Sequence, residues 1–185
     1  MIEAELKAYV VDPEALRARL RRLADEETSV YHDTYYDTPA RHFTASGCEL
    51  RIRVVDSADG ARRTVLTYKE PPADAASRSK PEHETTIADA TVLDVILRAL
   101  GTVRLVAFEK RCANYRFTAK DRDMLATMVA VPEIDGMFLE LETLATEDDL
   151  AAALADVRAV LGELGITEID LTTEEYTDAV IHARA

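Results

Sequence analysis

Hydrophobic and polar residues alternate with a period of two along much of this chain. In a strand, side chains two residues apart point to the same face, so each alternating segment predicts a strand with one apolar face. The pattern, with turn signals such as Asp37-Thr38-Pro39 and Asp59-Gly60, predicts eight strands. They are expected near residues 2–11, 30–36, 47–55, 62–69, 82–87, 103–117, 124–131 and 137–143.

Helical periodicity separates and follows these strands. Caps and glycine stops mark four expected helices, the first opened by Asp12-Pro13. They run through Leu16, Leu20 and Leu23; over 89–100 before Gly101; from Leu150 to Leu164 before Gly165; and, opened by Thr172–Glu175, through Tyr176, Val180 and Ile181. A polar connection is expected from Pro71 to Pro81. The order of elements favours an α+β fold in a single domain over residues 1–185.

Composition narrows the classes of partner. The formal net charge of -13 disfavours a nucleic acid polymer, because binding to its phosphates depends on Lys and Arg. Although 48% of the residues are hydrophobic, no apolar run reaches the roughly 18 residues of a membrane span, and the N-terminus does not resemble a signal peptide. We therefore expect a soluble, cytoplasmic protein without a membrane partner.

The sequence does not predict a zinc site. Cys48 and Cys112 lie in separate strand-like stretches, so the favoured interpretation is two free thiols in a reducing compartment. The four histidines also lack the spacing of zinc ligands.

Charged residues gather on single faces of several strands. The groups that share a face are Glu3, Glu5 and Lys7; Glu49, Arg51 and Arg53; Glu82 and Glu84; and Glu140 and Glu142. For one strand alone, a face exposed to water is the better explanation. Exposed faces more often carry mixed polar residues, however, and here carboxylates and basic residues recur together. If the sheet closed into a barrel, these faces would line its interior.

A charged lumen is costly unless its ions pair or bind a ligand. Carboxylates suit oxygen-loving cations such as Mg²⁺ or Mn²⁺, whereas Arg and Lys bind phosphate oxygens. The combination suits a metal–triphosphate complex, in which the metal ions and lumen bases offset the acidic net charge.

The segment Glu3-Ala4-Glu5-Leu6-Lys7 resembles the ExExK signature of the CYTH superfamily, the triphosphate tunnel metalloenzymes. Further matching segments follow in the family's order along essentially the whole chain. They are Asp33-Thr34-Tyr35-Tyr36-Asp37-Thr38-Pro39, Glu49-Leu50-Arg51-Ile52-Arg53, Thr67-Tyr68-Lys69, Glu82-His83-Glu84, Lys110, Phe138-Leu139-Glu140-Leu141-Glu142 and the helix around Tyr176.

The resemblance implies an eight-stranded closed antiparallel β-barrel, a tunnel with helices packed outside, and two-metal phosphoryl chemistry, often in homodimers. The implied metal ligands are Glu3, Glu5, Glu140 and Glu142. The implied catalytic residues are Lys7, Lys69, Glu82 and Glu84, the two glutamates also supporting the metal ligands. The implied phosphate-binding residues are Lys7, Arg51, Arg53, Lys69, Lys110 and Arg116.

Two positions depart from the family pattern. Val129 stands where an Asp is common, two residues before Val131-Pro132, and Cys112 stands where a second base is common after Lys110. A bulge could turn Arg111 inward. Arg116 could replace part of the lost charge or could lie at the tunnel rim.

Three functions follow from this pattern. Metal-dependent hydrolysis of a triphosphate requires the fewest parts: a phosphate cradle, a metal and an oriented water. The alternative is a class IV-type adenylate cyclase that converts ATP to cyclic AMP and pyrophosphate. The third is a tunnel that binds a nucleotide or polyphosphate without turnover, an interpretation that Val129 and Cys112 favour.

Overall fold

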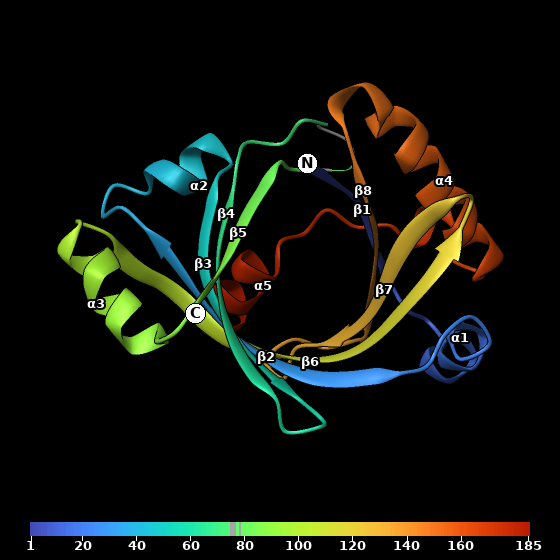
Figure 1. Ribbon diagram of the computed structural model, residues 1–185, viewed down its shortest axis with the longest axis horizontal. Coiled ribbons are helices and arrows are strands. Elements are labelled where there is room, and N and C mark those ends of the chain that lie inside the picture. Colours follow the sequence, from blue (N-terminus) through green and yellow to red (C-terminus); the bar gives the residue numbers. More distant parts are fainter. Residues whose placement is uncertain (75–76, 78) are drawn as a thin grey trace.

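The computed structural model describes residues 1–74, 77 and 79–185. The predicted connection from Pro71 to Pro81 thus includes three positions, 75, 76 and 78, outside the described residues. Eight antiparallel strands form one strongly curved sheet (Figure 1). In chain order they are β1 (Ile2–Tyr9), β2 (Glu27–Asp37), β3 (Glu49–Ser57), β4 (Arg62–Lys69), β5 (Glu82–Ile87), β6 (Val103–Ala119), β7 (Arg122–Ala130) and β8 (Phe138–Ala145).

The helices lie around this sheet. They are α1 (Pro13–Leu20), α2 (His42–Ser46), α3 (Ala90–Ala99), α4 (Leu150–Glu163) and α5 (Tyr176–Ala183), with short 3₁₀ turns η1 (Glu147–Asp149) and η2 (Glu168–Asp170). In Figure 1, α1 and α4 cover one outer side of the sheet, α2 and α3 cover the other, and α5 lies on the concave side. None of the helices in the described ranges is long and apolar enough to span a membrane.

The sheet closes almost completely into a barrel. Its strand order is β1-β8-β7-β6-β2-β3-β4-β5, so β1 and β5 are the two edges. An isolated bridge between Ile2 and Pro81 joins them, and the Glu3 amide donates to the carbonyl of Lys80 at 3.3 Å. The predicted α+β fold with eight antiparallel strands is confirmed, but the predicted closed barrel overstated its closure. At the seam between β1 and β5 the described residues form an isolated bridge rather than a strand pairing.

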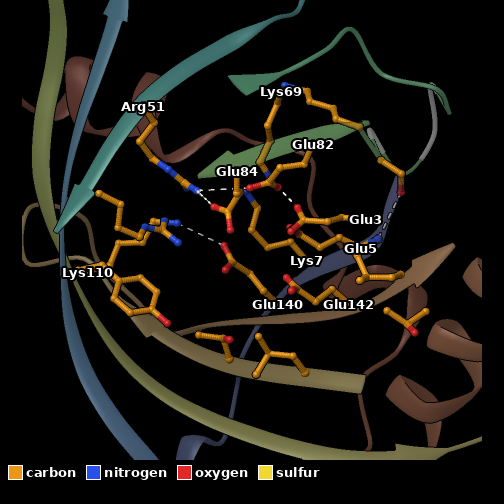
Figure 2. A pocket seen from close by; sticks show the side chains of 18 of the residues that line it. Glu3, Glu5, Lys7, Arg51, Lys69, Glu82, Glu84, Lys110, Glu140 and Glu142 are labelled. Atoms are coloured by element: carbon orange, nitrogen blue, oxygen red, sulfur yellow. Dashed lines mark hydrogen bonds and ion pairs between the residues drawn. The ribbon is translucent and has the colours of Figure 1, made fainter. Parts of the chain in front are cut away.

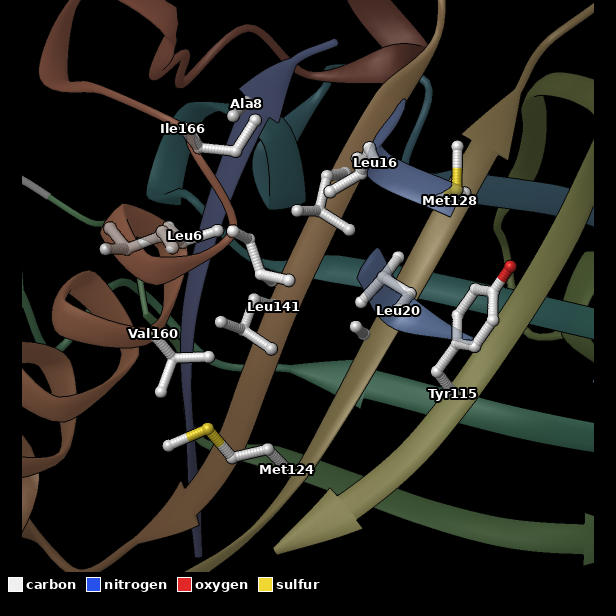
Figure 3. Packing of buried hydrophobic residues seen from close by; sticks show 14 of the residues in the cluster. Leu6, Ala8, Leu16, Leu20, Tyr115, Met124, Met128, Leu141, Val160 and Ile166 are labelled. Carbon is white, nitrogen blue, oxygen red and sulfur yellow. The ribbon is translucent and has the colours of Figure 1, made fainter. Parts of the chain in front are cut away.

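The apolar faces of the strands point outward, beneath the helices. Leu16 and Leu20 of α1 and Val160 of α4 pack on outward side chains such as Leu6 and Leu141 (Figure 3). On the other half of the sheet, Leu97 of α3 packs against Tyr36 and Ile52. The alternation that predicted the strands therefore places apolar residues under helices and leaves the charged residues facing inward.

Most strand boundaries shift by one to three residues from the sequence predictions, and the helices differ more. Helix α1 ends at Leu20, leaving Leu23 48% exposed outside it rather than on its apolar face. Helix α2 was not predicted, since its five residues are too few for a periodic signal. Helix α5 begins at Tyr176, because Thr172–Glu175 runs extended beside β1, with the Thr172 amide donating to the Lys7 carbonyl at 2.9 Å.

Candidate active site

The inward faces enclose a cavity of about 750 Å³. All twelve residues predicted for catalysis, metal binding or phosphate binding line it: Glu3, Glu5, Lys7, Arg51, Arg53, Lys69, Glu82, Glu84, Lys110, Arg116, Glu140 and Glu142. They come from β1, β3, β4, β5, β6 and β8. The charged strand faces therefore face one another across the lumen rather than facing bulk water.

Three carboxylates form a compact cluster. Each of Glu3, Glu5 and Glu142 offers an oxygen atom, and these three atoms lie within 4.8 Å of one another. The strand register explains this proximity, since Glu5 lies opposite Glu142 in the β1–β8 pairing. In Figure 2 these side chains gather on one side of the cavity, while Arg51 and Lys110 lie across from them.

The electrostatics of this cluster favour a bound cation. Burial, followed by the charge of Glu140, raises the pKa of Glu5 to about 7. Burial and the charges of Glu3 and Glu5 raise the pKa of Glu142 well above its usual range. Like charges held together in a poorly solvated site disfavour ionisation, and a divalent cation with oxygen ligands removes that penalty. Glu3, Glu5 and Glu142 therefore fit a metal ion such as Mg²⁺ or Mn²⁺.

Glu140, the fourth predicted ligand, lies outside this three-residue cluster. Its carboxylate is 3.5 Å from the Lys110 ammonium, which links β8 to β6 across the lumen. Although burial alone would raise it, the nearby charges of Lys110 and Lys7 hold the pKa of Glu140 below its usual value. Glu140 is thus a charged group beside the cations, and its role as a metal ligand stays a prediction.

Lys69 bridges the carboxylates of the seam. Its ammonium group lies 2.6 Å from Glu3 and 2.8 Å from Glu82. Burial opposes the charged form of Lys69, yet the charges of Glu3 and Glu82 raise its pKa well above the usual value. Lys69 therefore stays protonated and can neutralise an anion that enters beside the carboxylate cluster.

One buried aspartate, Asp33, contacts both Arg53 and Arg51. Asp33 accepts two hydrogen bonds of 2.7 Å from Arg53 and lies 3.9 Å from Arg51. Although burial acts in the opposite direction, the charges of Arg53 and Arg51 keep the pKa of Asp33 well below its usual range. Asp33 therefore fixes two guanidinium groups on the cavity wall.

Arg51 keeps a donor available. One of its terminal nitrogens donates to the Thr67 hydroxyl at 3.2 Å, and Thr67 in turn donates to Glu84 at 2.7 Å. Its buried Nε has no hydrogen-bond partner among the residues that the structure describes. An unpaired buried donor beside a cavity is costly, and a phosphate oxygen would satisfy it.

The structure adds residues that the sequence analysis did not select for the site. Lys80 is 6% exposed, forms an ion pair with Glu49 and lies 3.8 Å from Glu175. The polar connection before β5 carries it, so no strand alternation marked it. Tyr176 lines the cavity although it comes from the last helix. Only the folding of the chain end into the barrel could reveal that placement.

The departures from the family pattern have a clear structural outcome. Cys112 and Val129 lie opposite each other in the β6–β7 pairing and are buried with Phe138 and Tyr176. Burial raises the pKa of the Cys112 thiol to about 12, so the group remains neutral. Cys112 and Val129 are thus part of a buried apolar patch next to Tyr176, and they do not line the cavity themselves.

Arg111 and Arg116 do not place a positive charge in the lumen to replace the base that is common at the position of Cys112. Arg111 stays exposed and pairs with Glu109 on the outer face, so no bulge turns it inward. Arg116 is exposed at the edge of the cavity.

The chain belongs to the CYTH domain family, whose model matches residues 1–176. A Methanocaldococcus jannaschii protein named "Putative adenylate cyclase" is 26% identical over 181 residues, covering 96% of this chain and 98% of that protein. The structure of the PH1819 protein from Pyrococcus horikoshii superposes with a TM-score of 0.83 at 25% identity, covering 97% and 98% of the two chains.

A third comparison is with a Hippeastrum protein described as a "putative adenylyl cyclase" that reveals a dominant triphosphatase activity. It superposes with a TM-score of 0.68 at 21% identity, covering 98% of this chain and 96% of that one. That likeness shows the shared fold.

Proposed function

We propose that this protein is a divalent-metal-dependent hydrolase that cleaves a phosphoanhydride bond of a triphosphate bound in the cavity. The observation that carries the proposal is the meeting of two opposite charge groups in one enclosed space. Glu3, Glu5 and Glu142 form a carboxylate cluster, and basic residues from four strands face the same lumen. A triphosphate is the kind of ligand whose oxygen atoms could engage both.

In this proposal the chain mainly binds, orients and neutralises. Lys7, Arg51, Arg53, Lys69 and Lys110 would hold the phosphate oxygens and stabilise the charge that develops on them during cleavage. Glu3, Glu5, Glu142 and Glu140 would hold the metal, with Glu82 and Glu84 supporting them. A bound Mg²⁺ or Mn²⁺ supplies charge neutralisation and an activated water.

A class IV-type adenylate cyclase is the second candidate, favoured by the name of the Methanocaldococcus relative. Cyclisation needs the same phosphate cradle and also requires adenine recognition and an in-line ribose 3′ hydroxyl. When ATP is the substrate, the two reactions differ in their products.

A substrate panel tests both candidates. Purified protein would be incubated with inorganic triphosphate, ATP and thiamine triphosphate in Mg²⁺ and in Mn²⁺, and the products separated by chromatography. We expect orthophosphate release that disappears in EDTA. Cyclic AMP with pyrophosphate would instead favour the cyclase, and triphosphate binding without any product would favour a non-catalytic tunnel.

A further inference from the structure

The aromatic ring of Tyr176 contacts two of the proposed phosphate-binding cations. The ammonium nitrogen of Lys7 lies 4.3 Å from the ring centroid, and that of Lys110 lies 4.0 Å from it. Lys7 comes from β1 and Lys110 from β6, two strands that β8 and β7 separate in the sheet. One side chain from the end of the chain thus brings together cations from two separated walls of the lumen.

Neutral groups fix the position of this ring. Phe138 meets Tyr176 edge-on, with centroids 5.2 Å apart and an interplanar angle of 88°. Cys112 and Val129 belong to the same buried cluster, to which Val180 of α5 also contributes. Because these neighbours carry no charge, the lysine ammonium groups are the partners for the negative face of the ring. The buried apolar patch that includes Cys112 and Val129 therefore helps to hold Tyr176 in place.

The segment before Tyr176 holds Lys7 in the same place. The Lys7 ammonium donates to the backbone carbonyl of Glu174, and the Thr172 amide donates to the Lys7 carbonyl at 2.9 Å. The Tyr9 hydroxyl donates to the Glu174 carboxylate at 2.7 Å, which ties this segment to β1 a second time. Contacts of Lys7 with the chain end thus involve a carbonyl and a ring, both uncharged.

Uncharged partners matter for a cation that must bind phosphate. A carboxylate in direct contact would neutralise the ammonium group and compete with the substrate, since both are anions. The carbonyl and the ring hold the Lys7 ammonium by weaker attraction and leave its charge available. Lys110 also lies 3.5 Å from the Glu140 carboxylate, so for this lysine the ring adds an uncharged contact to an ion pair.

We propose that Tyr176 is a positioning residue whose ring holds Lys7 and Lys110 ready to bind the phosphates of one substrate molecule. This inference rests on the proposed function, because it requires that a triphosphate binds in this cavity. The ring, rather than the hydroxyl, carries the effect. The buried apolar patch at Cys112 and Val129 then acts on phosphate binding through Tyr176.

Three variants separate positioning from packing. Tyr176→Phe keeps the ring and Tyr176→Leu removes it, whereas Leu161→Ala loosens α4 at a buried site of another core cluster that is not part of the cavity lining. For each, the Kd of inorganic triphosphate would be measured by calorimetry in Mg²⁺, beside the thermal midpoint Tm. Where the wild type turns the compound over, kcat and KM would be added.

We expect Tyr176→Leu to weaken triphosphate binding about tenfold, the size of a desolvated cation–π contact. Tyr176→Phe should bind within about twofold of the wild type, and Leu161→Ala should lower Tm without this loss of affinity. The inference is overturned if Tyr176→Leu binds like the wild type, if Tyr176→Phe is as weak as Tyr176→Leu, or if Leu161→Ala weakens binding equally. A wild type that binds no triphosphate would instead refute the proposed function.

Discussion

Glu142 supplies one of the three carboxylates of the cluster, together with Glu3 and Glu5. Its replacement by glutamine keeps the shape of the side chain but removes a charged metal ligand. We expect Glu142→Gln to lower metal-dependent turnover by at least about 100-fold, because the metal would lose charge and orientation. The exposed Glu147→Gln is a matched control and should keep full activity. Initial rates would be measured over a Mg²⁺ titration. Tm, measured in parallel, would show whether the variant has lost stability instead.

Glu5 allows a pH test in the metal-free protein. Its pKa is about 7 in the folded state, above the 4.5 of an ordinary glutamate, because burial and then Glu140 oppose ionisation. The folded state therefore holds this proton more tightly, and Glu5 costs stability as the pH rises from about 4.5 through 7. Below about 4.5 this cost is absent.

Glu5→Gln removes the cost without removing the side chain. In EDTA at pH 8 we expect the variant to be more stable than the wild type by on the order of 1–3 kcal/mol. At pH 4.5 the difference should vanish, and added Mg²⁺ should stabilise the wild type far more than the variant. Denaturant midpoints at the two pH values give the measurement. An equal effect at both pH values would mean that charge repulsion is not the cause.

At the scale of elements, Asp37 joins the end of β2 to α2. The buried carboxylate accepts hydrogen bonds from the Thr38, Phe43 and Thr44 amides at 2.6, 2.9 and 3.0 Å, and from the Thr44 hydroxyl at 2.6 Å. Asp37→Ala leaves these donors without a partner, so we expect a loss of about 2 kcal/mol or more in unfolding free energy. Urea denaturation would measure it.

Asp59→Ala provides the control for this prediction. Asp59 sits in an exposed turn and accepts one hydrogen bond, from the Ala61 amide at 2.9 Å. Since water can replace that acceptor, we expect a loss below about 1 kcal/mol. Similar losses for the two variants would show that Asp37 does not organise the β2–α2 connection.

At the scale of the whole molecule, closure of the barrel depends on the short seam between β1 and β5. Besides the bridge from Ile2 to Pro81, the ion pairs of Lys69 with Glu3 and Glu82 span it. Lys69→Met would remove the ammonium group that contacts Glu3 and would leave Glu82 with Arg51, 3.8 Å away. We expect a destabilisation of about 3 kcal/mol, as for other broken buried ion pairs.

The location of that effect distinguishes it from general unfolding. Amide hydrogen exchange should accelerate first at residues 1–6 and 79–84, while the β2–β6 pairing in the middle of the sheet stays protected. Mg²⁺ bound at Glu3, Glu5 and Glu142 should restore part of the protection. Uniform acceleration along all strands would contradict a role for Lys69 in the seam.

The homodimer implied by the family resemblance stays a prediction, for which sedimentation velocity is the direct measurement.

Local sequence patterns determined the strands, their charged and apolar faces and most helix positions, because alternation fixes which side chains share a face. The same patterns predicted the charged residues that were later found around one cavity, from Glu3 on β1 to Glu142 on β8. Helix α2 gave no periodic signal, because it has only five residues. Sequence alone also left open whether the charged faces lie in a lumen or in water.

Tertiary structure alone decided which charges meet and what holds them. Strand register sets Glu5 opposite Glu142, and curvature brings Lys69 of β4 within ion-pair distance of Glu3 on β1. The placement of Tyr176 beside Lys7 joins residues from opposite ends of the chain. Such contacts depend on how the whole sheet curls and where the chain end enters it, which no local pattern encodes, whereas the inward or outward direction of each side chain follows from the strand itself.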